Sequence, residues 1–222
     1  MIATGPVPRT GAGAGAAPVE WQLAACAAPW PVQRRPHTVA CNRSGHCLTF
    51  TMSEPEVWLR GPLPGVPPLL QPVAHGLTQC RNEVRDALRD LAPALVWARP
   101  GGAASAGFHA CHAVGSLDRL LTYARGEQLS PAQHAALAAE AEPDMSEGAA
   151  GRLIAAFDAG IERALDQVRA TSEATLLDRR EVGRARLPST VLGLLVHATE
   201  HTQRHTGQLV TTVRIVRGTH AV

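Results

Sequence analysis

Aromatic residues are scarce in this sequence, since Phe, Trp and Tyr together make up 4% of its 222 residues. Proteins that bind single-stranded nucleic acid stack bases on exposed aromatic rings, so the shortage disfavours that class of function. An excess of charge of one sign is also lacking, because the formal net charge is only +2 and Lys or Arg residues form no clustered stripe. We therefore expect neither nucleic acid nor an anionic membrane surface as a partner.

No apolar run is long enough to span a membrane. The first residues also lack the basic start and continuous apolar stretch of a secretory signal, because several prolines and Glu20 interrupt them. We therefore expect a cytoplasmic protein whose five cysteines are reduced. Cys41, His46 and Cys47 fit no common spacing of zinc ligands, and a second half-site is missing.

The first 51 residues differ in composition from the rest of the chain. They open with "GPVPRTGAGAGAAP", which is Gly, Ala and Pro without a period, and no amphipathic pattern follows. Such a segment cannot bury enough apolar area to offset the entropy of ordering it. We predict that residues 1–51 are a disordered or artefactual extension, that translation starts at Met52, and that residues 52–222 form the folded domain.

Helical periodicity dominates the chain after residue 52, and no segment alternates convincingly with period two. The pattern predicts long helices within 67–92, 108–126, 146–172 and 188–216, and a short one within 129–143. Ser130 and Pro131 are typical of a helix start, Ser189 or Thr190 of another, and Gly126 of a helix end. Four long helices and a short one predict an all-α fold, a four-helix bundle.

The segment "HATEHTQRHTGQ" places three histidines one turn apart in an otherwise apolar helix. On a helical wheel His205 lies roughly 40° from the centre of the buried face, His201 roughly 80° and His197 roughly 120°. An i, i+4 pair of imidazoles on one face can bind a single metal ion. Hydrogen-bonded core histidines are the alternative. The buried face itself is predicted to contain Leu195, Ala198, Thr202, Leu209, Val213 and Val216.

Two ligands are too few for a useful metal site, so a third should come from another helix. The candidates in the folded part are His75, His109, His112 and His134. We expect His134 to be exposed on the short helix. On its helical wheel His112 lies away from the main Ala–Leu stripe, which is compatible with an inward-facing edge near one end of the bundle.

The segments "GFHACHAVGSLDRLLTYARGEQLS" and "HATEHTQRHTGQLV" resemble the DinB-like family of metal-binding four-helix bundles. The resemblance covers about residues 55–217. In that family the first ligand is a His followed by a small apolar pair, then Gly, Asp or Glu, and Ser, so "HAVGS" identifies His112. The family's H-x-x-x-H pair, usually followed by x-G-Q, identifies His201 and His205. The resemblance also implies an up-down-down-up order of the long helices.

The function that this resemblance implies is that of a divalent-metal-dependent enzyme. Three imidazoles leave an ion with an open position, and zinc or nickel are the first candidates, although iron, manganese or cobalt would also fit. Characterised relatives include transferases that use low-molecular-weight thiols, so an S-transferase with a thiol co-substrate and a small-molecule substrate is expected, often as a homodimer. The alternatives are a hydrolase, a non-catalytic metal-binding or stress-response bundle, and a bundle without metal.

Five further residues are candidates for the surroundings of the site. His197 is expected to be a neighbour of the ligands, and Glu200 either orients a ligand or is a solvated charge. Gln208 either lines the site or caps a backbone group. Arg119 and Tyr123 share the His112 side of their helix and either contact an anionic thiol or substrate, or form a salt bridge and a packing ring respectively.

Overall fold

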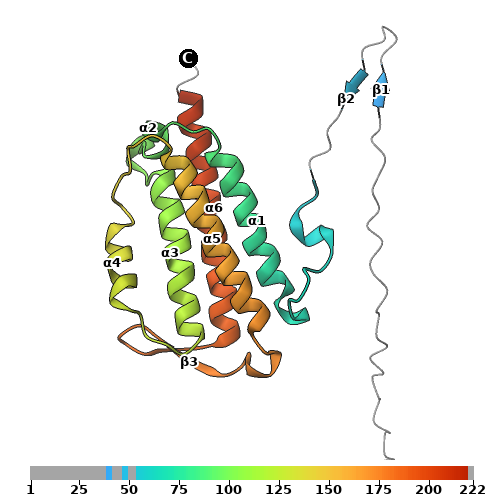
Figure 1. The fold of residues 1–222 in the computed structure, drawn as a ribbon, viewed down its shortest axis with the longest axis vertical. Helices are drawn as coiled ribbons and strands as arrows, with labels where there is room; N and C mark the ends of the chain where they lie inside the picture. The colour runs from blue at the N-terminus through green and yellow to red at the C-terminus, as the bar shows by residue number, and fades with distance from the viewer. Residues whose placement is uncertain (1–38, 42–46, 50–53, 220–222) are drawn as a thin grey trace, which may run out of the picture. The chain divides into compact units, whose positions relative to one another are not determined.

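The computed structural model describes residues 39–41, 47–49 and 54–219. Its four long helices are α1 (Gln71–Leu88), α3 (Ala106–Ala124), α5 (Ala149–Ala170) and α6 (Val191–Thr219), shown in Figure 1. The connections contain two short helices, α2 (Pro93–Val96) and α4 (Pro131–Ala139). They also contain the 3-10 turns η1 (Val57–Arg60), η2 (Pro68–Leu70), η3 (Pro100–Gly102) and η4 (Glu173–Thr175). The predominantly helical fold that the periodicity predicts is confirmed.

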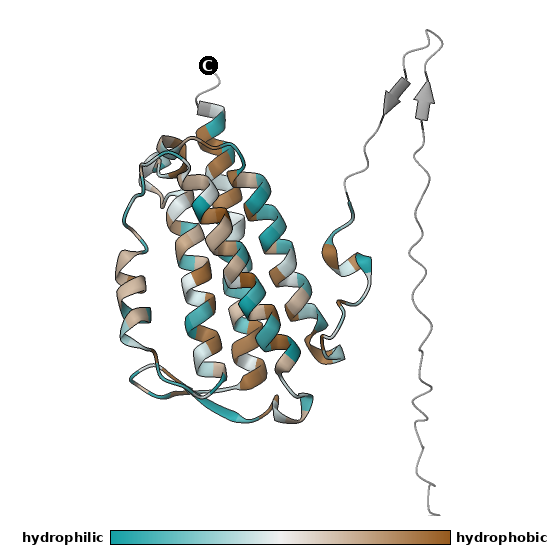
Figure 2. Cartoon of the chain, in the orientation of Figure 1, coloured by the Kyte–Doolittle hydropathy of each residue, from teal (hydrophilic) through white to brown (hydrophobic). Residues whose placement is uncertain are grey.

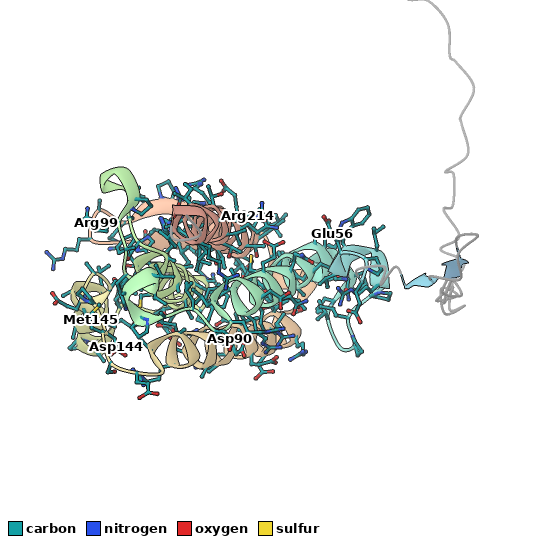
Figure 3. The ribbon with its side chains drawn as sticks, turned by 90° about the horizontal axis from the view of Figure 1, so that it is seen from above. Glu56, Asp90, Arg99, Asp144, Met145 and Arg214 are labelled. Carbon is teal, nitrogen blue, oxygen red and sulfur yellow. The ribbon has the colours of Figure 1, made fainter. Side chains whose placement is uncertain are left out.

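The long helices pack around a shared apolar core. Helix α6 packs against α1 and α3, and α5 packs against the same two helices. The charged residues Asp90, Arg99 and Arg214, labelled in Figure 3, are exposed. Figure 2 shows hydrophobic and hydrophilic residues interspersed along each long helix, as expected of helices with one buried and one exposed face. The most deeply buried large side chains include Leu77, Leu117, Phe157, Ile161, Leu195 and Leu209.

Helix α6 follows the helical wheel closely. All six residues predicted for its buried face are buried, and Thr202 and Leu209 are fully inaccessible to solvent. Thr202 satisfies its hydroxyl by donating to the carbonyl of Ala198, 2.8 Å away, so a polar residue is accommodated inside the core without an unpaired group. The opposite face is exposed, as amphipathic periodicity requires.

Helix ends match the signals in the sequence. The hydroxyl of Ser130 accepts from the backbone N–H of Gln133, whose side chain completes a capping box before Pro131 in the first turn of α4. At the start of α6 the hydroxyl of Thr190 accepts from the N–H of Gly193 at 3.0 Å, which decides between the two predicted caps. Gly126 follows α3 with a φ of 82°, the left-handed conformation that glycine tolerates best.

Two short antiparallel pairs of strands were not predicted. Strands β3 (Arg179–Val182) and β4 (Leu187–Thr190) pair Arg180 with Ser189 and form a hairpin before α6. Each has only four residues and none of them is buried, so an alternation of apolar and polar residues has no room to develop. The second pair is β1 (Val39–Cys41) with β2 (Cys47–Thr49).

Of residues 1–51, which the sequence predicts to be disordered, the structure describes only the strands β1 and β2. The prediction for the rest of this segment lies outside the described residues. The start of translation at Met52 also stays a prediction. Within the described part of the chain, no helix combines the length and the apolar character that crossing a membrane requires.

Candidate metal centre

Three histidines from two long helices meet at one point between α3 and α6. His112 belongs to α3, and His201 and His205 belong to α6. One ring nitrogen from each lies within 4.8 Å of the other two, and the ring centroid of His205 is 4.6 Å from both other rings. All three side chains are partly exposed, so the point is accessible to solvent. The structure therefore brings together the three residues that the sequence selects as metal ligands.

The local environment favours neutral imidazoles. Burial, and next the neighbouring His112, lower the pKa of His201 below its ordinary value. The same two causes, with His201 and His109 adding to them, lower the pKa of His205 to about 4. At neutral pH these two rings are therefore uncharged, and each has a nitrogen lone pair. Neutral imidazole is the form in which histidine binds metal ions.

The donor geometry fits a divalent ion. The Nε2 atoms of His112 and His201 face each other at 3.2 Å. Two imidazole nitrogens bound to one tetrahedral zinc ion at about 2.0–2.1 Å would lie about 3.3 Å apart. Facing lone pairs at this distance repel each other unless a proton or a cation lies between them. His112 and His201 therefore have the chemistry and the spacing of two ligands of one ion, and a ring nitrogen of His205 lies close enough to be the third.

A buried carboxylate lies behind His112. Glu140, the residue directly after α4, is only 7% exposed, and its Oε2 atom is 2.7 Å from Nδ1 of His112. Its other oxygen accepts from Nη1 of Arg119 at 2.6 Å. A carboxylate bonded to the second nitrogen of a metal-binding His is the usual arrangement in metal sites. Nothing in the sequence singles out Glu140, because Glu142 stands two residues away in the same segment and only the docking of α4 distinguishes the two.

His205 has a different neighbour. Its Nδ1 atom lies 3.1 Å from Nδ1 of His109, a residue of α3 that is 7% exposed. One of the two rings must donate to the other, because facing lone pairs would repel. Burial and then His112 lower the pKa of His109, so this ring is neutral at pH 7 and able to accept. His109, which the sequence also offers as a candidate for the third ligand, thus contacts the ring of His205 and is not part of the three-histidine cluster.

The five residues predicted to surround the site differ in their positions: one contacts Glu140, one is in the core and three are exposed. Arg119 reaches the site through Glu140, whereas Tyr123 is buried in the hydrophobic core as a packing ring. His197 and Glu200 are exposed and pair with each other at 3.2 Å, and Glu200 also accepts from Arg204. Hydrogen bonds from His197 and Arg204 lower the pKa of Glu200. Gln208 is exposed beyond His205.

The ring of Phe108 borders the histidines, and Cys111 directly precedes His112 in the chain. The ring of Phe108 stacks on that of His112, with centroids 5.4 Å apart and planes 10° from parallel, which gives one side of the site an apolar wall. Cys111 is half-buried, and burial followed by the charge of Glu140 raises the pKa of its thiol. A thiol with a raised pKa is a poor nucleophile at neutral pH.

Comparison with known proteins identifies the family of the chain. The sequence model of one family, the DinB superfamily, matches residues 76–209 and thus includes all three clustered histidines. A search of curated proteins finds no match to the chain. Since the family match covers more than half of the sequence, the chain belongs to the DinB superfamily.

Proposed function

We propose that this protein is a divalent-metal-dependent enzyme, and that it transfers a low-molecular-weight thiol to an electrophilic small molecule. The observation that carries the proposal is the convergence of His112, His201 and His205 on one solvent-accessible point. The DinB superfamily includes metal-dependent enzymes, which supports the same conclusion. We propose zinc or nickel as the ion, a homodimer as the assembly and the cytoplasm as its location.

When bound, such an ion would lower the pKa of a thiol placed at its open position and so supply a thiolate at neutral pH. In the transfer, the thiol sulfur forms a bond to an electrophilic carbon while the bond from that carbon to its leaving group breaks. The leaving group departs with the electron pair, and the thiol proton passes to solvent. His112, His201 and His205 would hold the ion, and the Phe108 ring would shield one side of the site from water.

We also propose the up-down-down-up order of a four-helix bundle for the long helices. In Figure 1 the chain runs in one direction through α1 and α6 and in the opposite direction through α3 and α5. The packing of α1 and α3 against both α5 and α6 supports this order. Because α3 and α5 then run parallel, the segment that contains α4 must return the chain along the outside of the bundle.

Metal content and thiol transfer test the proposed function together. We expect protein purified without an affinity tag to contain about one divalent ion per chain. We further expect it to consume a thiol from a panel of low-molecular-weight thiols when an epoxide or a chloro-aromatic compound is supplied. A double variant, His201→Ala with His205→Ala, should lose both properties. The control is His134→Ala, which removes an exposed His of α4 outside the cluster. Stoichiometric metal in the double variant would contradict the site.

A non-catalytic metal-binding bundle is the second candidate. The three histidines come from α3 and α6, so an ion there would cross-link two long helices that already pack against each other. Protein that binds metal, and melts at a higher temperature with it, but transfers no thiol in the whole panel would favour this candidate over the enzyme.

A further inference from the structure

Helix α4 is attached to the rest of the protein in an unusual way. None of its nine residues is buried, although it is rich in alanine and apolar in Figure 2. It lies beside α3 in Figure 1, outside the group of long helices. Apolar burial therefore contributes little to holding it there, and its attachment must come from polar contacts.

Two polar anchors, one at each end, provide that attachment. At the start of α4 the side-chain amide of Gln133 donates to Oδ2 of Asp118 at 2.6 Å and to the hydroxyl of Thr122 at 2.8 Å. At the end, Glu140 contacts His112 and Arg119. Only the second anchor involves a candidate metal ligand.

The helix α3 is shaped to receive the Glu140 carboxylate. Gly115 lies one turn after His112, and a Cβ atom at that position would collide with Oε1 of Glu140 and come within 3.0 Å of Arg119 Nη1. A residue without a side chain is therefore what allows the carboxylate to lie against the backbone of α3. Both oxygens of this buried carboxylate then have a partner, as a buried charge requires.

The contact with Glu140 determines which nitrogen of His112 is free. A carboxylate only accepts hydrogen bonds, so Nδ1 of a neutral His112 must carry the proton and donate it. A neutral imidazole has one N–H, which leaves the lone pair on Nε2. This is the nitrogen that faces His201 across 3.2 Å. The carboxylate thus selects the tautomer in which the lone pair points into the histidine cluster.

We propose that Glu140 is a positioning residue for the metal centre, and that α4 is a strap that carries it there. Glu140 fixes both the tautomer and the ring orientation of His112, and Arg119 and Gly115 fix Glu140. Docking of α4 and binding of the ion therefore stabilise each other. This inference rests on the metal-binding part of the proposed function, and it assigns Glu140 no contact with substrate.

The test compares Glu140→Ala and Glu140→Gln with a control at the other anchor, Gln133→Ala. The glutamine keeps an oxygen that accepts from His112 but removes the charge, so it separates the hydrogen bond from electrostatic attraction. In competition with a chromophoric chelator we expect Glu140→Ala to bind Zn²⁺ about 10- to 100-fold more weakly than wild type. The loss in Glu140→Gln should be smaller. Gln133→Ala should weaken binding less than Glu140→Ala does, because it loosens α4 but leaves the Glu140 carboxylate in place.

A second measurement uses the metal-free protein and reports the tautomer directly. In ¹⁵N NMR spectra of the histidine rings we expect His112 to be protonated on Nδ1 in wild type and in Glu140→Gln. In Glu140→Ala we expect a mixture of tautomers with more of the Nε2-protonated form. A purely structural role of Glu140 would change the melting temperature without changing the tautomer.

The outcomes separate the inference from the proposed function. If wild type binds no metal but the Glu140→Ala variant changes the tautomer, the proposed function fails and the tautomer selection stands. If wild type binds metal and Glu140→Ala binds it equally well, the positioning role is overturned and the proposed function stands. An equal loss of affinity in Gln133→Ala and Glu140→Ala would also overturn the inference, because general loosening of α4 would then be the cause.

Discussion

Helix α5 buries eight of its residues, mainly against α1 and α3, whereas α4 buries none and is attached through Gln133 and Glu140. The first is held by apolar area removed from water, a contribution that is large and insensitive to small shifts. The second is held by hydrogen bonds and one buried ion pair, whose net free energies are small and depend on every partner being present. The long helices should therefore stay folded when the site is damaged, while α4 should respond to it.

The largest effect should come from removing a core side chain of α5. Phe157 is 1% exposed, and we expect Phe157→Ala to lower the free energy of unfolding by about 3–5 kcal/mol through the cavity that remains. Urea denaturation monitored by circular dichroism measures it. The matched control in α4 is Leu137→Ala, which removes a side chain of a residue that is 42% exposed and should change stability by less than about 0.5 kcal/mol. Similar losses in both variants would mean that α4 is packed as the long helices are.

Metal removal should have the next largest effect. With free metal at 100 times its Kd, binding to the folded state alone adds about 2.7 kcal/mol to the free energy of unfolding. We therefore expect a chelator to lower the melting temperature, and to speed amide hydrogen exchange in α4 more than in the core of α5. His205→Ala protein should not respond to the chelator. Wild-type protein that melts at the same temperature with and without metal would contradict a structural contribution from the ion.

A glycine substitution can distinguish an effect on metal affinity from an effect on the stability of the bundle. Gly115→Ala places a methyl group against the Glu140 carboxylate, and we expect about tenfold weaker metal binding in a chelator competition. The stability of the bundle should change little, because alanine is favoured over glycine in a helix by about 1 kcal/mol, which offsets the displacement. Gly151→Ala in α5 is the control, since a Cβ there has no neighbour within 4 Å. Equal metal affinity in the two variants would show that Gly115 does not shape the site.

The smallest effect should be the pH dependence of the metal-free protein. The pKa of His205 is about 4 in the folded state and 6.5 ordinarily, so between these values the unfolded chain binds more protons. Stability should therefore fall as the pH is lowered from 6.5 towards 4. The ring is partly exposed, so solvent reduces the size of the effect. Denaturation midpoints across this range measure it. Stability should fall less steeply with decreasing pH in His205→Gln. An equally steep fall in this variant would assign the pH dependence to other groups.

The helices were predictable because their signals are local. The 3.6-residue period of α6 identified six of its buried residues, and Ser130 with Pro131 identified the start of α4. The short hairpin β3–β4 was missed, since four-residue strands carry too few side chains for an alternation. His112, His201 and His205 were found through the resemblance of their motifs, and the structure brings them together.

The sequence by itself determined the predominantly helical fold, the faces that the helices bury and the histidines that are able to share an ion. Periodicity, caps and i, i+4 spacing act within a few turns, so they can be read along the chain. Only the tertiary structure decided that Glu140, 28 residues from His112, lies behind it, and that Arg119 donates to the other carboxylate oxygen of Glu140. Such contacts depend on where α4 docks against α3, and that position follows from the packing of whole helices, which no local pattern encodes.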